Sequence, residues 1–231
     1  MIAEVKKFIA GELEGWQKGE LIWFTFCITA AVAISIYLRD NLAGIIAAAS
    51  GICYTLLAGK GKISCYAFGI INTILYGWIS LKTQLFGEVM LNWGWYLPMM
   101  FSGFFFWKRN LSKSNIIRKT TLTWRGRAVC FLASLAGIII YGFILKKMGD
   151  TQPFTDSTTT VLSVTAMILT VKRCSDQWLL WTAVNAISTF MWLKVFQLDG
   201  KYAAVLIMWL LNLANGIIFY FQWKKDIRNA G

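Results

Sequence analysis

The stretch LLWTAVNAISTFMWLKVF, residues 179–196, decides how this chain folds, because it is apolar enough to cross a bilayer yet holds polar side chains at its centre. A membrane-spanning helix needs about 20 largely apolar residues. At about 100° per residue, five side chains of residues 178–192 fall within an arc of about 80°. They are Trp178, Trp181, Asn185, Ser188 and Trp192. Because polar groups in hydrocarbon are costly unless partnered or facing water, the stretch predicts a spanning helix with one polar face directed away from lipid.

The composition of the whole chain favours a membrane protein with many spans. Of its 231 residues, 57% are hydrophobic and 15% are charged, whereas a soluble domain carries about 25% charged residues. The net charge of +12 does not indicate nucleic acid, because Lys and Arg cluster between the apolar runs, as membrane topology requires. The chain has no histidine, and its five cysteines form no CxxC pair. We therefore expect no metal site, no cofactor and no disulfide framework.

Eight apolar runs predict an all-α polytopic membrane protein with about eight transmembrane helices. The predicted spans are 21–38, 41–58, 63–81, 86–107, 126–145, 155–171, 177–196 and 201–223. Residues 1–20 predict an amphipathic segment on the membrane surface, because apolar residues recur there at helical spacing and glutamates exclude a signal peptide. If the N-terminus is cytoplasmic, seventeen Lys and Arg residues lie inside and six outside. This bias predicts that both termini are cytoplasmic.

The chain also repeats itself at an offset of 113 residues. Asn72 aligns with Asn185, and further matches pair Gln84 with Gln197 and Gly103 with Gly216. Such a repeat is common in membrane transporters. It predicts two parallel three-helix repeats, 41–107 and 154–223, joined by the basic loop and linking helix 108–147, with the span 21–38 outside the symmetry. This is a 3+1+3 arrangement with one extra N-terminal helix.

Polar residues with aromatic neighbours recur on the other repeat helices. Besides the five residues of 178–192, the candidate substrate-binding residues are Phe68, Asn72, Tyr76, Asn92, Trp95, Thr160, Asn212 and Asn215. Helix 86–107 places Glu88 on the same face as Asn92 and Trp95, while the small residues of 43–51 predict close helix packing. A second interpretation is that the tryptophans form an interfacial belt and the asparagines join helices. Asp156 equally fits a helix cap or a binding role.

These residues predict a water-accessible central cavity for a flat ligand. No Lys or Arg lies deep in the spans, so an anionic or phosphorylated ligand would lack a counter-charge. Aromatic rings stack on planar rings and attract cations, and amides bond hydroxyls and amides. A membrane enzyme would need an acid–base pair or a metal cluster, and a channel would not need so many aromatic residues. The acids Glu88 and Asp156 are expected near helix ends, so ion coupling through deep acids is not predicted.

The chain resembles the PnuC family of bacterial vitamin transporters. The second half carries the likeness in FTDSTTTVLSVTAMILTVKR (154–173) and QWLLWTAVNAISTFMWLKVFQLDGKYAAVLIMWLLN (177–212), and the first half in AFGIINTILYGWISLKTQLFGEVMLNWGW (67–95). The resemblance implies a SWEET-like 3+1+3 fold in the bacterial inner membrane and a homo-oligomer, with a trimer favoured. It implies uptake of nicotinamide riboside by facilitated diffusion, followed by phosphorylation by a separate kinase. Members of the family also carry thiamine or riboflavin.

Overall fold

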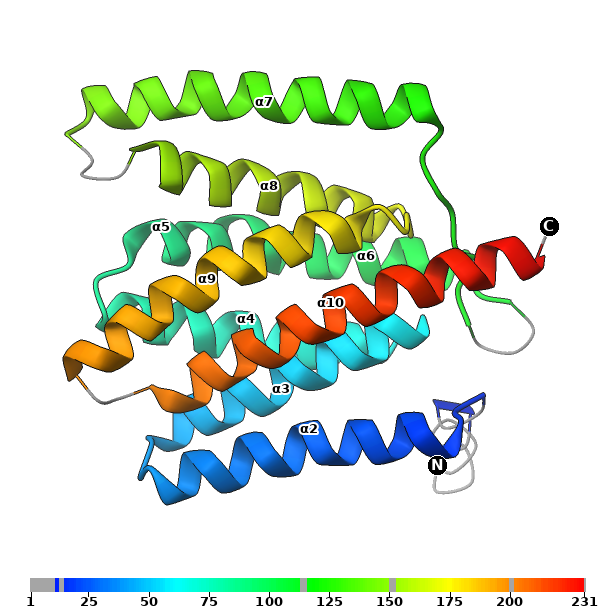
Figure 1. Ribbon diagram of the computed structural model, residues 1–231, viewed down its shortest axis with the longest axis horizontal. Helices are drawn as coiled ribbons and strands as arrows, with labels where there is room; N and C mark the ends of the chain where they lie inside the picture. The colour runs from blue at the N-terminus through cyan, green and yellow to red at the C-terminus, as the bar shows by residue number, and fades with distance from the viewer. Residues whose placement is uncertain (1–10, 13–14, 113–115, 150–152, 200–201, 231) are drawn as a thin grey trace.

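The computed structural model is a bundle of long helices that lie side by side (Figure 1). It describes residues 11–12, 15–112, 116–149, 153–199 and 202–230. The helices are α2 (Lys18–Tyr37), α3 (Leu42–Lys60), α4 (Cys65–Lys82), α5 (Phe86–Val89), η1 (Met90–Tyr96), α6 (Leu97–Lys108), α7 (Trp124–Lys147), α8 (Pro153–Val171), α9 (Gln177–Asp199) and α10 (Ala203–Ala230). The elements α5, η1 and α6 form one continuous helical segment, 86–108, with a π-helical stretch in its middle.

The predicted helix positions are confirmed, because each helix begins and ends within three residues of its predicted bounds, except that α10 extends to Ala230. Six of the described helices are long and apolar enough to cross a membrane, namely α2, α3, α7, α8, α9 and α10. Two of the eight predicted spans are not among these six. One is α4, which carries Asn72 and Thr73, and the other is the segment 86–108, which the π-helical stretch divides. The predicted surface segment 1–20 falls mostly outside the described residues, since 1–10 and 13–14 are not described.

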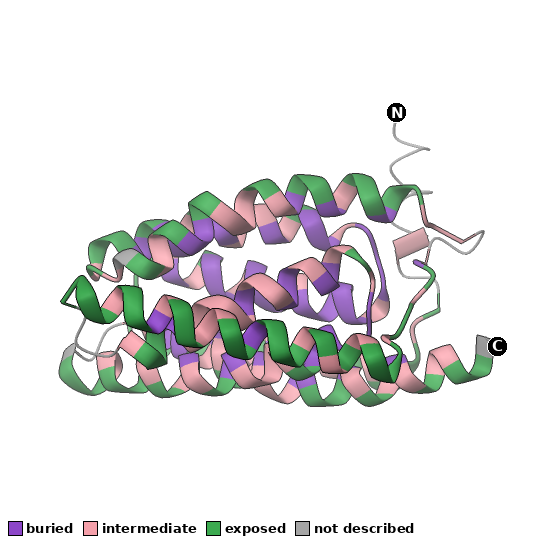
Figure 2. Ribbon diagram, turned by 90° about the horizontal axis from the view of Figure 1, so that it is seen from above, coloured by how far each residue is buried: buried purple, intermediate pink, exposed green. Residues whose placement is uncertain are grey.

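Helix α3 is enclosed by α2, α4 and α10, whereas α2 and α7 lie at opposite edges of the bundle (Figure 1). Of the six apolar helices, α3 has the most buried span and α7 the least. The inward faces of the helices carry the buried residues, while the outward faces are largely exposed (Figure 2). Helix α7 packs against α8, and α2 packs against α3 and α10. The exposed apolar side chains of α7, such as Phe131 and Ile140, are suited to lipid contact.

The two predicted helix triplets exchange their third helices, in the sense that the third helix of each triplet packs against the first helix of the other. Helix α10, the last of the second triplet, packs against α3, and α6, the last of the first triplet, packs against α8 (Figure 1). Each contact includes a fully buried tryptophan that donates its indole N–H to a backbone carbonyl. Trp223 Nε1 donates to Gly59 O at 2.6 Å, and Trp107 Nε1 donates to Thr170 O at 2.9 Å. The triplets are therefore bound to one another by equivalent contacts.

The turns after α3 and α8 have the same backbone hydrogen bonds, at an offset one residue shorter than predicted. Gly61 N–H donates to Ala58 O at 3.0 Å, and Arg173 N–H donates to Thr170 O at 2.9 Å. The next matched bonds are Lys62 to Leu57 with Cys174 to Leu169, and Cys65 to Lys62 with Gln177 to Cys174. Since Arg173 follows Gly61 by 112 residues, the predicted offset of 113 is wrong for this region. Counted along the helices from these turns, Asn185 corresponds to Thr73, the neighbour of Asn72.

One extended segment before α7 connects both of these turns. We call residues 116–123 the strap. Ile117 N–H donates to Gly61 O at 3.1 Å, and Thr120 N–H donates to Arg173 O at 2.9 Å. Farther along, Leu122 N–H donates to Asp176 Oδ2 at 2.9 Å, and Arg127 Nε lies 2.6 Å from Asp176 Oδ1. Because Gly61 and Arg173 are matched positions, the strap holds the same end of both triplets together.

Candidate functional site

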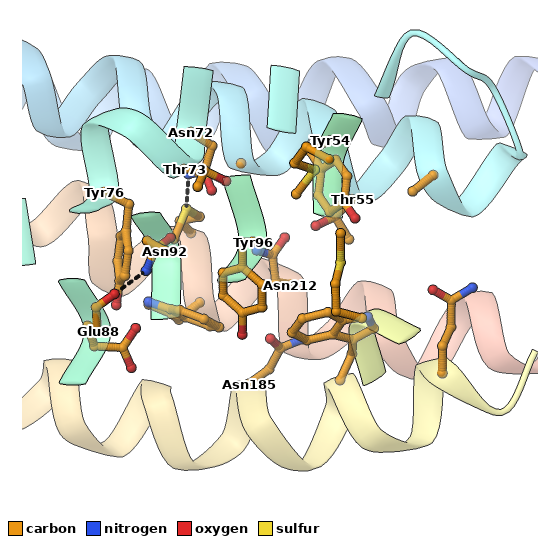
Figure 3. Close-up of a pocket in the computed structure, with 18 of the residues that line it drawn as sticks. Tyr54, Thr55, Asn72, Thr73, Tyr76, Glu88, Asn92, Tyr96, Asn185 and Asn212 are labelled. Carbon is orange, nitrogen blue, oxygen red and sulfur yellow. Dashed lines mark hydrogen bonds between the residues drawn. The ribbon is translucent and has the colours of Figure 1, made fainter. Parts of the chain in front are cut away.

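A cavity lies between the helices of the two triplets, and all six of those helices line it (Figure 3). The described lining residues are Gly51, Tyr54, Thr55, Ala58, Asn72, Thr73, Tyr76, Glu88, Asn92, Tyr96, Met100, Met167, Gln177, Trp178, Trp181, Asn185, Met208, Trp209 and Asn212. None of them comes from α2 or α7. The volume open to the centre of a water-sized sphere is about 90 Å³. A single water needs about 10–15 Å³ by that measure, so the cavity holds several waters or part of a small organic ligand.

Helices α3 and α4 form the wall of the cavity around Asn72. Its Nδ2 donates to Ala47 O at 2.8 Å. The same atom lies 3.5 Å from Met208 Sδ (Figure 3). Gly51 makes this approach feasible, since a Cβ at that position would lie 2.7 Å from Asn72 Nδ2. The small residue Gly51 of α3 therefore allows the Asn72 amide of α4 and the Met208 thioether of α10 to pack together against α3.

Aromatic side chains form two further parts of the wall. The Trp181 ring lies 5.9 Å from the Tyr96 ring, and Trp181 Nε1 donates to Thr170 Oγ1 at 2.9 Å. Tyr76 accepts a hydrogen bond at its hydroxyl from Trp192 Nε1 at 2.6 Å, and its ring lies 5.8 Å from that of Trp209. These contacts fix the rings in place, so their faces are preorganised for a planar ligand.

The π-helical stretch sets which residues of segment 86–108 face the cavity. A regular α-helix would place Trp95 on the face of Glu88 and Asn92. The i→i+5 hydrogen bonding of η1 widens each turn, so the lining face instead continues from Asn92 to Tyr96 and Met100. Asn92 Nδ2, in η1, donates to the backbone oxygen of Glu88, in α5, at 2.8 Å. Trp95 is packed with the hydrophobic core and does not line the cavity.

Several buried polar atoms of the cavity residues have no hydrogen-bond partner among the residues that the structure describes. They include Tyr54 Oη, Gln177 Nε2, Trp178 Nε1 and Asn212 Oδ1. A buried donor or acceptor without a partner costs about 1–3 kcal/mol. Water or a polar ligand in the cavity would satisfy these atoms, and the set contains both donors and an acceptor. The cavity is thus suited to a ligand with hydroxyl and amide groups.

Seven of the thirteen predicted site residues line the cavity. They are Asn72, Tyr76, Asn92, Trp178, Trp181, Asn185 and Asn212. The structure places the other six outside the lining, namely Phe68, Trp95, Thr160, Ser188, Trp192 and Asn215.

Two of the six residues outside the lining, Asn215 and Trp192, have hydrogen-bond partners that account for their polarity. Asn215 is fully buried and accepts a hydrogen bond at Oδ1 from Trp23 Nε1 of α2 at 2.8 Å, because α2 covers this face of α10. Trp192 is fully buried behind the cavity and orients Tyr76. Phe68 packs with the core, while Ser188 is buried in α9. Thr160 is half-buried in α8.

Sequence reasoning did not select twelve lining residues. They are Gly51, Tyr54, Thr55, Ala58, Thr73, Glu88, Tyr96, Met100, Met167, Gln177, Met208 and Trp209. Glu88 was expected near the end of its helix, and it is indeed the third residue there, yet it also lines the cavity. The spacing of Gly51, Tyr54, Thr55 and Ala58 on one helical face was a signal that could have identified the contribution of α3. The apolar Met100 and Met167 gave no comparable signal.

The chemical composition of the cavity limits what it can bind. Among the described lining residues, Glu88 is the single charged side chain, and there is no Lys or Arg. No group of three or more His, Cys, Asp or Glu that could hold a metal ion occurs in the described part of the chain. Long apolar helices around a cavity of aromatic and amide side chains define a membrane transporter of a small organic solute.

The chain belongs to the family described as "Nicotinamide mononucleotide transporter", which matches residues 41–225. A "Nicotinamide riboside transporter PnuC" from Neisseria mucosa is 30% identical over 220 residues, which cover 93% of this chain and 84% of the relative. A protein of the same name from Haemophilus influenzae is 30% identical over 222 residues, covering 94% and 95% of the two chains. The predicted resemblance to the PnuC family is thereby confirmed.

A solved structure supports the fold as well as the family. The "Crystal structure of the Vitamin B3 transporter PnuC" matches with a TM-score of 0.88 and 29% sequence identity, and covers 97% of this chain and 99% of its own. The relatives are named as transporters and not as enzymes. The chain is therefore an all-helical, multi-pass bacterial membrane transporter, as its sequence predicted.

Proposed function

We propose that this protein takes up nicotinamide riboside by facilitated diffusion through the central cavity. One observation carries the proposal: the lining combines fixed aromatic rings with unpartnered polar atoms and contains no Lys or Arg among its described residues. Nicotinamide riboside has a cationic pyridinium ring, a carboxamide and ribose hydroxyls, and it has no phosphate. The names of the curated relatives support the same substrate.

The nucleotide named in the family description is a poorer fit to this cavity than the riboside. A phosphate group is best bound by Arg, Lys or several backbone N–H groups. The described lining offers Glu88 in place of a cation, and two negative charges in a place of low dielectric repel each other strongly. We therefore expect the phosphorylated form to be excluded, so that phosphorylation inside the cell would trap the imported riboside.

Each part of the substrate has a matching part of the wall. Trp181 and Tyr96 lie on one side, and we assign them to the pyridinium ring, since aromatic faces attract cations. Asn185 lies one turn along α9 from Trp181 and is assigned to the carboxamide or a ribose hydroxyl. The unpartnered Gln177 Nε2 and Asn212 Oδ1 supply further bonds to hydroxyls. Asn72, Asn92, Tyr76 and Trp178 complete the proposed binding set.

The proposal includes a topology of eight spans in a 3+1+3 arrangement. Its parts are the surface segment 1–20, the extra helix 21–38, the first triplet 41–107, the linking part 108–147 and the second triplet 154–223. Support comes from the exchanged third helices and the matched turns of the two triplets. The bias of Lys and Arg supports cytoplasmic termini. The family resemblance supports a homo-oligomer, with a trimer favoured.

Facilitated diffusion is proposed because the described cavity offers a single acid. Coupling to Na⁺ or H⁺ commonly uses several intramembrane acids, and Glu88 has no acidic partner in the lining. Purified protein in liposomes should carry nicotinamide riboside until the concentrations on both sides are equal. Accumulation driven by an imposed Na⁺ or pH gradient, at zero membrane potential, would contradict this part of the proposal.

A binding titration tests the substrate. Purified protein is titrated with nicotinamide riboside, nicotinamide mononucleotide, thiamine and riboflavin. The riboside should bind most tightly, and the mononucleotide roughly a hundredfold or more weakly, because its phosphate meets no cation. Tighter binding of thiamine or riboflavin would show that one of these vitamins, and not nicotinamide riboside, is the substrate. The protein would still be a vitamin transporter. Tight binding of the mononucleotide would contradict the charge argument itself.

A further inference from the structure

We propose that Glu88 makes the cavity selective for a cationic ring over a neutral ring of the same shape. This inference rests on the proposed function and adds the residue that determines the charge of the ligand. Glu88 is the one charged side chain among the described residues of the lining. In Figure 3 its carboxylate faces the same space as Tyr96 and Asn185. The sequence placed Glu88 near a helix end, on the same face as Asn92 and Trp95, but did not include it among the candidate binding residues.

The geometry of segment 86–108 aims Glu88 inward. Glu88, Asn92, Tyr96 and Met100 follow one another at intervals of four residues, and the π-helical stretch keeps them all on the cavity side. The backbone oxygen of Glu88 also accepts the hydrogen bond from Asn92 Nδ2 at 2.8 Å. This bond ties the Asn92 side chain to the turn that carries Glu88, so the carboxylate and the amide are held together at one end of the cavity.

Among the described residues, no Lys or Arg forms a salt bridge with Glu88, and the charged group that interacts with it electrostatically is another acid, Asp156. Of the three salt bridges that the structure gives between described residues, none includes Glu88; they involve Glu20, Asp226 and Asp176. A carboxylate away from bulk water is poorly solvated, and a cation close to it gains far more than it would in water. A positively charged ligand would therefore supply the counter-charge that the described protein groups do not provide to Glu88.

The aromatic rings alone do not account for selection by charge. Trp181, Tyr96, Tyr76 and Trp209 attract a cation, but they also stack on a neutral planar ring. A carboxylate distinguishes the two, because its interaction with a neutral ring lacks the direct charge–charge attraction. The rings thus select for shape and Glu88 selects for charge, and the two contributions are separable by experiment.

The simpler interpretation is that Glu88 stabilises its helix. It is the third residue of the segment, and acidic side chains in a first turn interact favourably with the helix dipole. That role predicts a change in thermal stability that is independent of the ligand. The proposed role predicts a change in affinity that depends on the charge of the ligand, so a pair of ligands with the same groups and different charge distinguishes the roles.

Nicotinamide riboside and its 1,4-dihydro form are such a pair. Both carry the carboxamide and the ribose, and only the oxidised form has the pyridinium charge. Each is titrated at pH 8 into purified wild-type protein, Glu88→Gln and Asp226→Asn, with melting temperatures recorded. Asp226 is the control, since it is an acid of α10 that forms a salt bridge with Lys119 and is not part of the lining.

The wild-type protein should prefer the cationic form by at least roughly tenfold. Glu88→Gln should weaken binding of the cation roughly ten- to a hundredfold and change the affinity for the dihydro form by less than about threefold. Asp226→Asn should leave the ratio of the two affinities unchanged. Equal affinities in the wild-type protein, or an unaltered ratio in Glu88→Gln, would overturn the inference. A wild-type protein that binds neither riboside overturns the proposed function itself, and with it the inference.

Discussion

Replacing Trp181 by leucine would remove an aromatic face from the wall of the cavity and keep an apolar side chain in its place. The Trp181 ring lies 5.9 Å from the Tyr96 ring, and its indole N–H bonds to Thr170 Oγ1 at 2.9 Å. A cation–π contact away from water is worth about 2 kcal/mol, and each 1.4 kcal/mol is a factor of ten in affinity. We therefore expect Trp181→Leu to weaken binding of nicotinamide riboside roughly ten- to thirtyfold.

The indole hydrogen bond must be separated from the ring face. Thr170→Val removes the acceptor oxygen and keeps the shape of the side chain. Because Thr170 is not part of the lining, this variant should lose about 1 kcal/mol of stability through the lost bond. Its affinity should fall by less than about threefold, since the Trp181 ring stays next to Tyr96. Trp181→Phe, which keeps a smaller aromatic face, should bind with an affinity between those of the wild-type protein and Trp181→Leu.

Isothermal titration calorimetry of the purified variants measures these affinities, and a melting curve of each variant shows whether it is folded. Leu179→Ala is the matched control on the same helix, because Leu179 is 48% exposed and lies outside the lining. It should bind the riboside as the wild-type protein does. If Trp181→Leu melts normally and binds within about twofold of the wild-type affinity, Trp181 does not contact the ring and the assignment is wrong.

Three further predictions concern the turns and the topology. Burial raises the pKa of Asp176, but the hydrogen bonds from Leu122 N–H and Arg127 together with its other hydrogen bonds lower that pKa by more than burial raises it. The pKa of Asp176 in the folded protein therefore lies below the ordinary value. The stabilisation by this carboxylate is present above the unfolded pKa of about 3.9 and is lost as the pH falls below it. The melting temperature of the wild-type protein should therefore drop more between pH 5 and pH 3 than that of Asp176→Asn. Parallel curves of melting temperature against pH for the two proteins would contradict the reasoning. Thr120→Pro deletes the N–H that donates to Arg173 O, whereas Thr120→Val keeps that N–H. The proline variant should therefore have the lower melting temperature. Equal melting temperatures of the two variants would show that the strap does not stabilise the turns. Reporter fusions at the C-terminus and between α7 and α8 should report opposite sides of the membrane, the former cytoplasmic, and an external C-terminus would refute the topology.

The sequence was sufficient to locate the helices and part of the cavity, because both leave local signals. Apolar runs separated by short basic loops give the helix positions. An amide such as Asn72 or Asn185 in the middle of an apolar run needs a partner or a wet surface, and both residues line the cavity. The predicted family followed from the segments 67–95, 154–173 and 177–212, which include both of these residues.

The remainder depends on contacts that no local pattern records. The π-helical stretch η1 moves the lining face from Trp95 to Tyr96, and a calculation at a fixed angle per residue cannot include it. Asn215 was predicted to line the cavity, but the packing of α2 on α10 gives it Trp23 as a partner instead. Matching the repeats by identical residues placed Asn72 opposite Asn185, whereas the hydrogen bonds of the turns place Thr73 there.

The exchange of third helices has a consequence for how the protein is made. Helix α3 leaves the ribosome early, but its Gly51 and Gly59 are covered by Met208 and Phe219 of α10, which is synthesised much later. The bond from Trp223 to Gly59 joins residues 164 positions apart in the chain. Throughout translation, therefore, the groove of α3 faces lipid or an insertion factor and not its native neighbour. A nascent chain that stops before α10 would present this groove to membrane proteases, so premature termination should yield degradation and not a half-sized transporter.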